Sequence, residues 1–126
     1  MRRAIETANV ISAPHKLQPQ TIDAFIECNV GDWEGLSWEQ IQHRDWDYFK
    51  AFEADPATVP YAGGESFQQV QDRAIPALDE LIRNCAGDFV VVTHNIVGRV
   101  IIANAMEMPT SRSRIIHLDN AGISML

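Results

Sequence analysis

A histidine stands where an apolar segment turns into a predicted helix. Residues 89–92 (Phe-Val-Val-Val) are apolar without polar alternation, which is typical of a strand covered on both faces. Thr93, His94 and Asn95 follow, and a helix is predicted over residues 96–106. Backbone amides and the helix dipole favour an anion at such a turn, so His94 is a candidate phosphate ligand. The alternative is that His94 caps the helix or fills the turn.

Two arginines and a glutamate could act with this histidine. Arg3 precedes a predicted helix over residues 4–12, and Arg99 lies one turn into the helix after His94. A guanidinium can grip phosphate oxygens with two parallel hydrogen bonds, although either arginine could equally be a solvated surface charge. Glu27 ends a predicted strand over residues 21–27, where its carboxyl group could serve as a general acid or could simply be solvated.

The other candidate groups point to no additional chemistry. His15, His43 and His117 lie in a turn, on an amphipathic helix and in a late strand, and we interpret them as structural or solvated. No cluster of carboxylates or histidines has metal-ligand spacing, so we expect no metal and no other cofactor. Cys28 and Cys85 are far apart in the sequence, which favours free thiols in the cytoplasm over a disulfide.

The elements that position these residues follow from periodicity and capping. Ser37 with Gln40 has capping-box spacing and opens a predicted helix over residues 38–52. Ser66 with Gln69 opens a longer helix, bent at Pro76, that ends before Gly87. Glycine and proline mark residues 55–64 as a loop, and residues 115–118 and 122–126 are predicted as two last strands or as a strand and a return.

Composition limits the possible partners. The 126 residues are the size of one domain, and 46% of them are apolar, enough for a single core over residues 1–126. A net charge of -7 repels phosphate backbones and anionic lipids, which argues against nucleic acid and membranes as partners. Neither a membrane span nor a signal peptide is evident, so we expect a soluble, cytoplasmic protein.

Five short motifs, in order along nearly the whole chain, resemble those of the histidine phosphatases of the phosphoglycerate-mutase type. Residues 3–8 resemble the R-A-x-x-T-A helix, and residues 27–35 resemble the E-x-x-x-G-x-W-E-G loop. Residues 63–66 match G-G-E-S, residues 93–99 resemble T-H-G-G-V-x-R, and residues 120–124 resemble N-A-x-I-S.

This resemblance implies an α/β fold, a three-layer sandwich whose mostly parallel sheet carries the active site at one edge. In that family a histidine of an R-H-G motif on the first strand attacks a phosphate ester. Two arginines and a second histidine hold the phosphate oxygens, and a glutamate protonates the leaving oxygen. Carried over, Arg3 would be a phosphate arginine, His94 the second histidine and Glu27 the proton donor. These groups would stabilise the transferring phosphoryl group by charge.

The sequence departs from the family at two places. No R-H-G occurs in the 126 residues, so the nucleophile, one phosphate arginine and the strand that carries them are missing from this chain. Asn95 stands where the family commonly has glycine; its backbone amide can still face phosphate, but its side chain fills space. Apolar side chains left uncovered by the missing strand predict a homo-oligomer. Whether the natural chain begins at Met1 stays open.

Three functions follow from these features. The first is a phosphatase or mutase acting on phosphate monoesters, impaired in this form because the nucleophile is absent. The second is a non-catalytic domain that binds phosphate or a phosphorylated small molecule, or that serves a structural, oligomerising role. The third, geometrically poorer, is residual hydrolysis with His94 as nucleophile.

Overall fold

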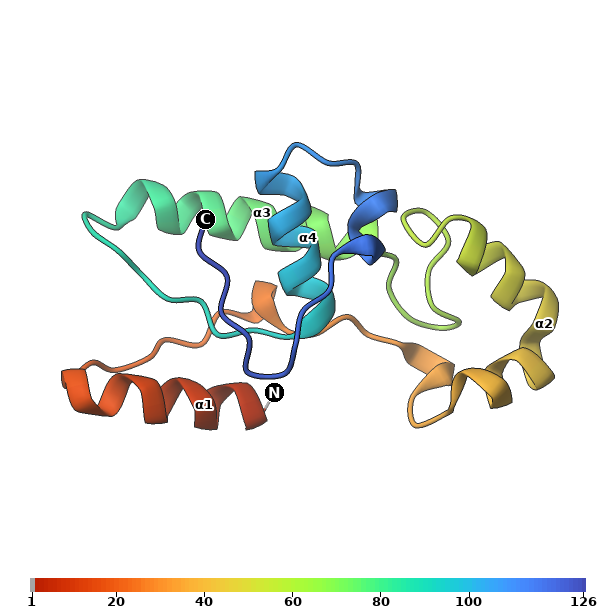
Figure 1. The fold of residues 1–126 in the computed structure, drawn as a ribbon, viewed down its shortest axis with the longest axis horizontal. Coiled ribbons are helices and arrows are strands. Elements are labelled where there is room, and N and C mark those ends of the chain that lie inside the picture. Colours follow the sequence, from red (N-terminus) through yellow and green to blue (C-terminus); the bar gives the residue numbers. More distant parts are fainter. Residues whose placement is uncertain (1) are drawn as a thin grey trace.

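The computed structural model describes residues 2–126, which form α-helices and short 3-10 helices joined by extended segments (Figure 1). The α-helices are α1 (Arg2–Ser12), α2 (Trp38–Ala54), α3 (Phe67–Asn84) and α4 (Asn95–Ala105). The 3-10 helices are η1 (Ala13–His15), η2 (Asp23–Phe25), η3 (Gly31–Trp33) and η4 (Thr110–Ile115).

The predicted helices are confirmed, and local capping explains where two of them begin. At the start of α2, the Ser37 hydroxyl accepts a hydrogen bond from the Gln40 amide, and the Gln40 side chain accepts one from the Ser37 amide. Ser66 and Gln69 form the same reciprocal pair at the start of α3, which contains Pro76. Each box satisfies two amides that the first helical turn leaves without a partner.

The predicted three-layer α/β sandwich with a mostly parallel sheet is wrong for this structure. Residues 2–126 contain no β-strand. Part of the expected strand 21–27 forms η2, and residues 89–92, 116–118 and 122–126 lie outside any regular element. A strand exists only through hydrogen bonds to a neighbour, and no backbone hydrogen bond joins these segments to one another. Residues 89–92 are also not buried as expected, since Val90 is 74% exposed.

The core lies where α3 packs on α4 and where α2 folds against the preceding loop. Trp33 is buried at the centre of an aromatic cluster, with edge-to-face contacts to Tyr48, Phe52 and Tyr61. Such contacts add to the free energy gained by burying the rings. In Figure 1, α2 lies at the opposite end of the molecule from α1, which has no buried residue.

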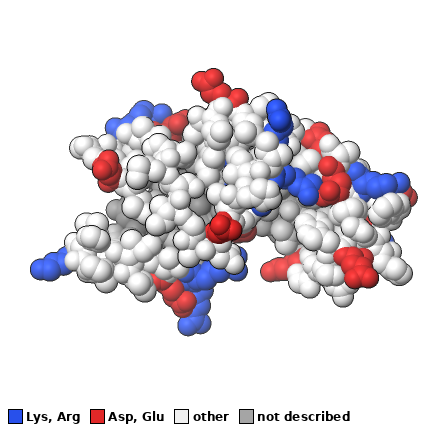
Figure 2. All heavy atoms as spheres, in the orientation of Figure 1, with Lys and Arg blue, Asp and Glu red and all other residues white. Residues whose placement is uncertain are grey.

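The surface carries charges of both signs. Figure 2 shows basic and acidic side chains interspersed over the visible face, as expected for an acidic chain with ten Lys and Arg residues. None of the helices within residues 2–126 has the length and apolar character that crossing a bilayer requires.

Candidate phosphate site

Two of the sequence motifs pack directly against each other. The Asp32 amide donates to the Ala62 carbonyl at 2.7 Å, and the Glu65 amide donates to the Asn29 carbonyl at 2.8 Å. Gly31 has a φ of 54°, and a methyl group there would lie 2.2 Å from the Ala62 carbonyl oxygen. The backbones approach so closely that glycine is required at this position. The loop after Glu27 is thereby held by the Gly-Gly-Glu-Ser turn.

Arg73 of α3 connects this turn to the loop that carries Glu27. Its Nε and Nη2 atoms bind the Glu65 carboxylate at 2.8 and 3.0 Å. Its other hydrogen bonds go to the backbone carbonyls of Ala24, at 2.7 Å, and Glu27, at 3.3 Å. Sequence reasoning missed Arg73, because an arginine within an amphipathic helix gives no local sign of its partner. The one indication in the sequence was that Glu65 would need a positively charged partner.

Glu65 is held ionised by this arrangement. Partial burial alone would raise the pKa of Glu65, but hydrogen bonds from Arg73 and from the Asn29 amide outweigh it and lower the pKa. The Glu65 carboxylate is thus a permanent negative anchor for Arg73. Since Arg73 also binds the Glu27 carbonyl, the pair fixes the backbone from which the Glu27 side chain projects.

The Glu27 side chain lies at the N-terminus of α4. Its Oε1 accepts hydrogen bonds from the Cys28 amide at 2.9 Å and the Ile96 amide at 3.2 Å. Its Oε2 has one longer contact, 3.4 Å from the Ile96 nitrogen. A carboxylate there is stabilised by the free amides and the helix dipole. The anion-binding helix start predicted from the sequence is therefore partly filled by Glu27, and Oε2 is the freer oxygen.

His94 occupies the N-cap position of α4, but its side chain makes no capping hydrogen bond. Its backbone is extended, and the preceding Thr93 hydroxyl donates to the Phe25 carbonyl at 2.8 Å, which ties this turn to the Glu27 loop. The imidazole instead contacts Arg3: the Arg3 Nη2 and His94 Nδ1 atoms are 3.4 Å apart. A guanidinium only donates, so Nδ1 accepts and the neutral ring carries its proton on Nε2.

The protonation state of His94 follows from its surroundings. Partial burial lowers the pKa of His94 below its usual value, and the nearby Arg3 charge lowers it further, while Glu27 acts in the opposite direction. The ring is therefore mostly neutral at neutral pH. A dianion bound between Arg3 and His94 would favour the protonated ring, so anion binding and proton uptake should be coupled.

Asn95 and Arg99, the other predicted phosphate candidates, have different surroundings. The Asn95 side-chain amide lies 3.5 Å from the Leu118 carbonyl oxygen. Arg99 is partly buried, and its Nε is buried without a hydrogen-bond partner among the described residues. The structure thus brings Arg3, Glu27 and His94 to the start of α4, with Asn95 next to His94 in the chain.

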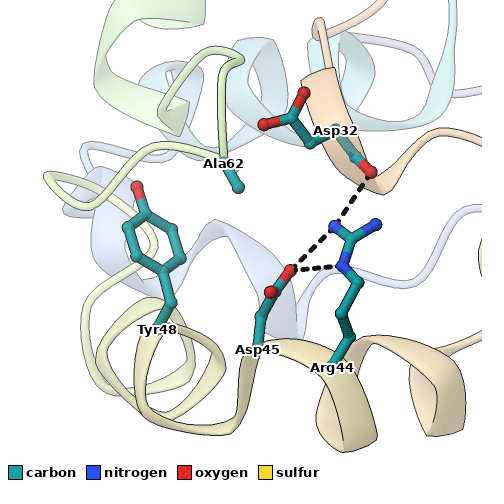
Figure 3. A pocket seen from close by; sticks show the side chains of 5 residues that line it. All are labelled: Asp32, Arg44, Asp45, Tyr48 and Ala62. Atoms are coloured by element: carbon teal, nitrogen blue, oxygen red, sulfur yellow. Dashed lines mark hydrogen bonds and ion pairs between the residues drawn. The ribbon is translucent and has the colours of Figure 1, made fainter.

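A hollow of about 470 Å³ lies elsewhere, between η3 and α2, and is lined by Asp32, Arg44, Asp45, Tyr48 and Ala62 (Figure 3). The Arg44 guanidinium is already bound to the Asp45 carboxylate at 2.8 Å and to the Asp32 carbonyl at 3.0 Å. Hydrogen bonds from Arg44 and the Trp33 indole lower the pKa of Asp45. Arg44, Asp45 and the Asp32 carbonyl therefore bind one another, and these contacts link η3 to α2. Helix α2 lies away from α1 (Figure 1).

Two other titratable side chains near Glu27 are inactive at neutral pH. Burial, reinforced by the charges of Glu65 and Glu27, raises the pKa of the Cys28 thiol to about 12. Burial likewise raises the pKa of Tyr61 to about 12. Neither group supplies a nucleophile. Within residues 2–126, no group of three or more His, Cys, Asp or Glu side chains is arranged to hold a metal ion.

Comparison with known proteins identifies the family. The sequence profile of the histidine phosphatase superfamily (branch 1) matches residues 1–126. The fructose-2,6-bisphosphatase of Saccharomyces cerevisiae is 33% identical over 114 residues, which span 90% of this chain and 24% of that protein. The phosphoglycerate mutase-like protein 4 of Arabidopsis thaliana is 33% identical over 108 residues, which span 83% of this chain and 47% of that protein.

Solved structures agree with this assignment. The mycobacterial glucosyl-3-phosphoglycerate phosphatase in complex with inorganic phosphate is 25% identical, with a TM-score of 0.77 over 91% of this chain and 59% of that one. The chain therefore spans less than two thirds of each of these proteins. The profile match and the motifs at Arg3, Glu27 and His94 together lead to one conclusion: the chain belongs to the histidine phosphatase superfamily.

Proposed function

We propose that this chain binds the phosphoryl group of phosphate monoesters between Arg3 and His94. The proposal rests on one observation: the Arg3 Nη2 and His94 Nδ1 atoms lie 3.4 Å apart, although the two residues are separated by 91 positions in the sequence. The guanidinium donates to the neutral imidazole there, and once the ring takes up a proton both side chains are donors that suit the oxygens of a phosphoryl group. Family membership supports the same ligand class.

The roles of the site residues follow from their contacts. Arg3 donates to phosphoryl oxygens, and His94 donates from its ring nitrogens once it is protonated. In the family reaction a glutamate protonates the leaving oxygen, and Oε2 is the Glu27 oxygen available for that step, since Oε1 already accepts two amide hydrogen bonds. The Asn95 backbone amide adds a donor beside His94.

We further propose that these 126 residues bind phosphate but do not turn phosphate esters over. They contain no R-H-G motif, and the Cys28 thiol, whose pKa is raised to about 12, is not available as a thiolate nucleophile. The third hypothesis, attack by His94, would require Arg3 and Glu27 to rearrange around a new line of attack. The two free thiols are consistent with a cytoplasmic protein.

Ligand-induced stabilisation tests the binding site. Inorganic phosphate at ten times its dissociation constant should stabilise the fold by about 1.4 kcal/mol, a rise of roughly 4 °C in the melting temperature. We expect Arg3→Ala and His94→Ala to lose this shift. The matched control is Arg2→Ala, because Arg2 is the neighbouring residue of α1 and its side chain binds Glu6 instead. Equal shifts in Arg3→Ala and Arg2→Ala would eliminate the site.

Turnover of an aryl phosphate tests the second proposal, that these residues do not hydrolyse phosphate esters. We expect no hydrolysis above the rate of a Glu27→Gln, His94→Ala double variant. A measurable rate in the parent chain that disappears in each single variant, but persists in Glu34→Gln, would show a working enzyme and contradict the non-catalytic proposal. Glu34 is a suitable control because it is exposed and follows the same loop.

A further inference from the structure

An apolar groove of about 240 Å³ runs between α1 and the segment that precedes α4. None of its lining residues is acidic, lysine or arginine, and most are apolar: Ala4, Ile5, Ala8, Pro19, Ile22, Phe25, Ile26, Leu81, Phe89, Val90, Val91 and Val92, together with Asn9, Gln20, Thr21 and His94. Ile5 is 42% and Val90 74% exposed. An apolar hollow of this kind on a chain with 21% charged residues indicates a surface meant to be covered.

The backbone along this groove has free hydrogen-bonding groups. Among the described residues 2–126, no backbone hydrogen bond involves residues 18–21 on one side or residues 86–93 on the other. Both segments lie outside any helix. An extended chain laid into the groove could therefore pair with backbone amides and carbonyls on its borders, as in strand addition. The occupant should be extended, apolar and uncharged.

The segment Gly122–Leu126 has the properties of such an occupant. Ile123 and Met125 are each 95% exposed, and Leu126 is 72% exposed. Residues 123–126 make no backbone hydrogen bond and lie in no helix. None of the five residues lines the groove of its own chain. We propose that Gly122–Leu126 of a second copy of this chain occupies the groove, and that the exchange is reciprocal.

Length and charge both fit this exchange. Five extended residues span about 17 Å, the same length as residues 89–93 on the groove border. Neither surface contains a charged side chain, so the net charge of -7 does not act directly across the contact. Because each copy has one groove and one segment, the same contact forms twice and closes a two-fold symmetric dimer. His94 lines the groove as well as contacting Arg3, whereas Arg3 does not line the groove, so Arg3→Ala separates the exchange from phosphate binding.

Light scattering after size-exclusion chromatography, from 1 to 100 µM, tests the proposal. We expect dimers that dissociate on dilution and no larger species. Val90→Lys in the groove and the double variant Ile123→Lys, Met125→Lys should each be at least tenfold weaker in dimerisation. The control is Val10→Lys, because Val10 on α1 is 75% exposed, as much as Val90, but does not line the groove. A monomeric parent chain at 100 µM, or equal weakening by Val10→Lys, would overturn the proposal.

A mixing experiment separates exchange from other contacts. The Val90→Lys chain retains an intact segment, and the Ile123→Lys, Met125→Lys chain retains an intact groove. Mixed at 100 µM, the two should form a heterodimer through one of the two contacts, whereas each remains monomeric alone. Failure to form the heterodimer would refute reciprocal exchange. All these positions are at least 74% exposed, so the variants should fold.

Amide hydrogen exchange identifies the occupied groove. We expect protection of residues 89–93 that increases with protein concentration in the parent chain and is absent in the Ile123→Lys, Met125→Lys variant. Protection that is independent of concentration would mean that a chain fills its own groove, which contradicts the second copy. Arg3→Ala should still dimerise, so loss of phosphate binding and loss of dimerisation are distinguishable.

Discussion

The two ends of the molecule are built in different ways. Around Trp33, the loop at residues 29–32, helix α2 and the turn at residues 61–65 close on one another through aromatic contacts and backbone hydrogen bonds. Around the groove, α1 buries no residue, and residues 86–93 have no backbone partner. The first region joins its segments by backbone hydrogen bonds and buries Trp33, Phe52 and Tyr61 by itself, although Trp38 and Trp46 remain about half exposed. The second region leaves its backbone groups and its apolar side chains to be covered by another chain segment.

This difference separates stability from function. The closed region holds Glu27 through the Gly31 loop, Glu65 and Arg73, so the position of the proposed proton donor is determined by the well-packed part of the fold. Arg3, by contrast, is exposed on a helix without a buried residue and touches His94 at the end of the open groove. We therefore expect the closed region to dominate the free energy of unfolding, while the open one determines association.

The largest effect should come from the aromatic cluster. Phe52 is completely buried against Trp33 and Tyr61, so Phe52→Ala should cost about 4 kcal/mol, through lost burial and the cavity left behind. The same change at Phe89, which is 39% exposed at the groove, should cost less than about 1.5 kcal/mol. Urea unfolding of both variants measures the contrast, and equal losses would remove the distinction between the two regions.

The close backbone approach at Gly31 should give the next largest effect. Gly31→Ala adds a methyl group 2.2 Å from a carbonyl oxygen at a positive φ, and we expect a loss of about 3 kcal/mol. Gly87→Ala is the control, because no atom lies within 4 Å of the added carbon. It should change stability by less than about 0.5 kcal/mol in thermal unfolding. A tolerated alanine at residue 31 would mean that the two motif loops are not packed as described.

Loss of Arg73 should have a smaller effect with a functional consequence. Arg73→Ala removes an ion pair that is one quarter exposed and two hydrogen bonds to backbone carbonyls, and should cost about 2 kcal/mol. Arg83→Ala, in the last turn of the same helix, should cost almost nothing, because Arg83 is exposed. If Arg73 positions the loop from Ala24 to Glu27, to which Thr93 ties the His94 turn, its variant should also bind phosphate more weakly at temperatures where it is fully folded. Unchanged affinity would limit Arg73 to a structural role.

The pH dependence of His94 should be the smallest effect. Its pKa is lowered on folding, so the unfolded chain binds more protons as the pH falls through about 6.5. The stability present above that pH is therefore partly lost below it. Between pH 7.5 and 5.5 the free energy of unfolding should fall less in His94→Gln than in the parent chain. Glu65 and Asp45 do not interfere, because their pKa values are lowered and they titrate below this pH range. An equal loss in both would contradict partial burial of the ring.

Sulfate extends the same test to binding, because it stays a dianion throughout this range. Its affinity should increase as the pH falls toward 5.5 in the parent chain, since binding favours the protonated His94 ring. In His94→Gln the affinity should be lower and should not depend on pH. A pH-independent affinity in the parent chain would show that His94 does not contact the anion.

Local sequence signals were enough to predict the helices of this protein and the kinds of side chain at its candidate site. The Ser37 and Ser66 capping boxes, the periodicity of α1 and the turn at His94 act over a few residues, so they could be interpreted without knowing the fold. Only the tertiary structure decided which groups meet: Arg3 with His94, Arg73 with Glu65, and the Glu27 carboxylate with α4. The expected sheet did not form because strands require partners, and residues 86–93 have no backbone partner in the part of the chain that the structure describes.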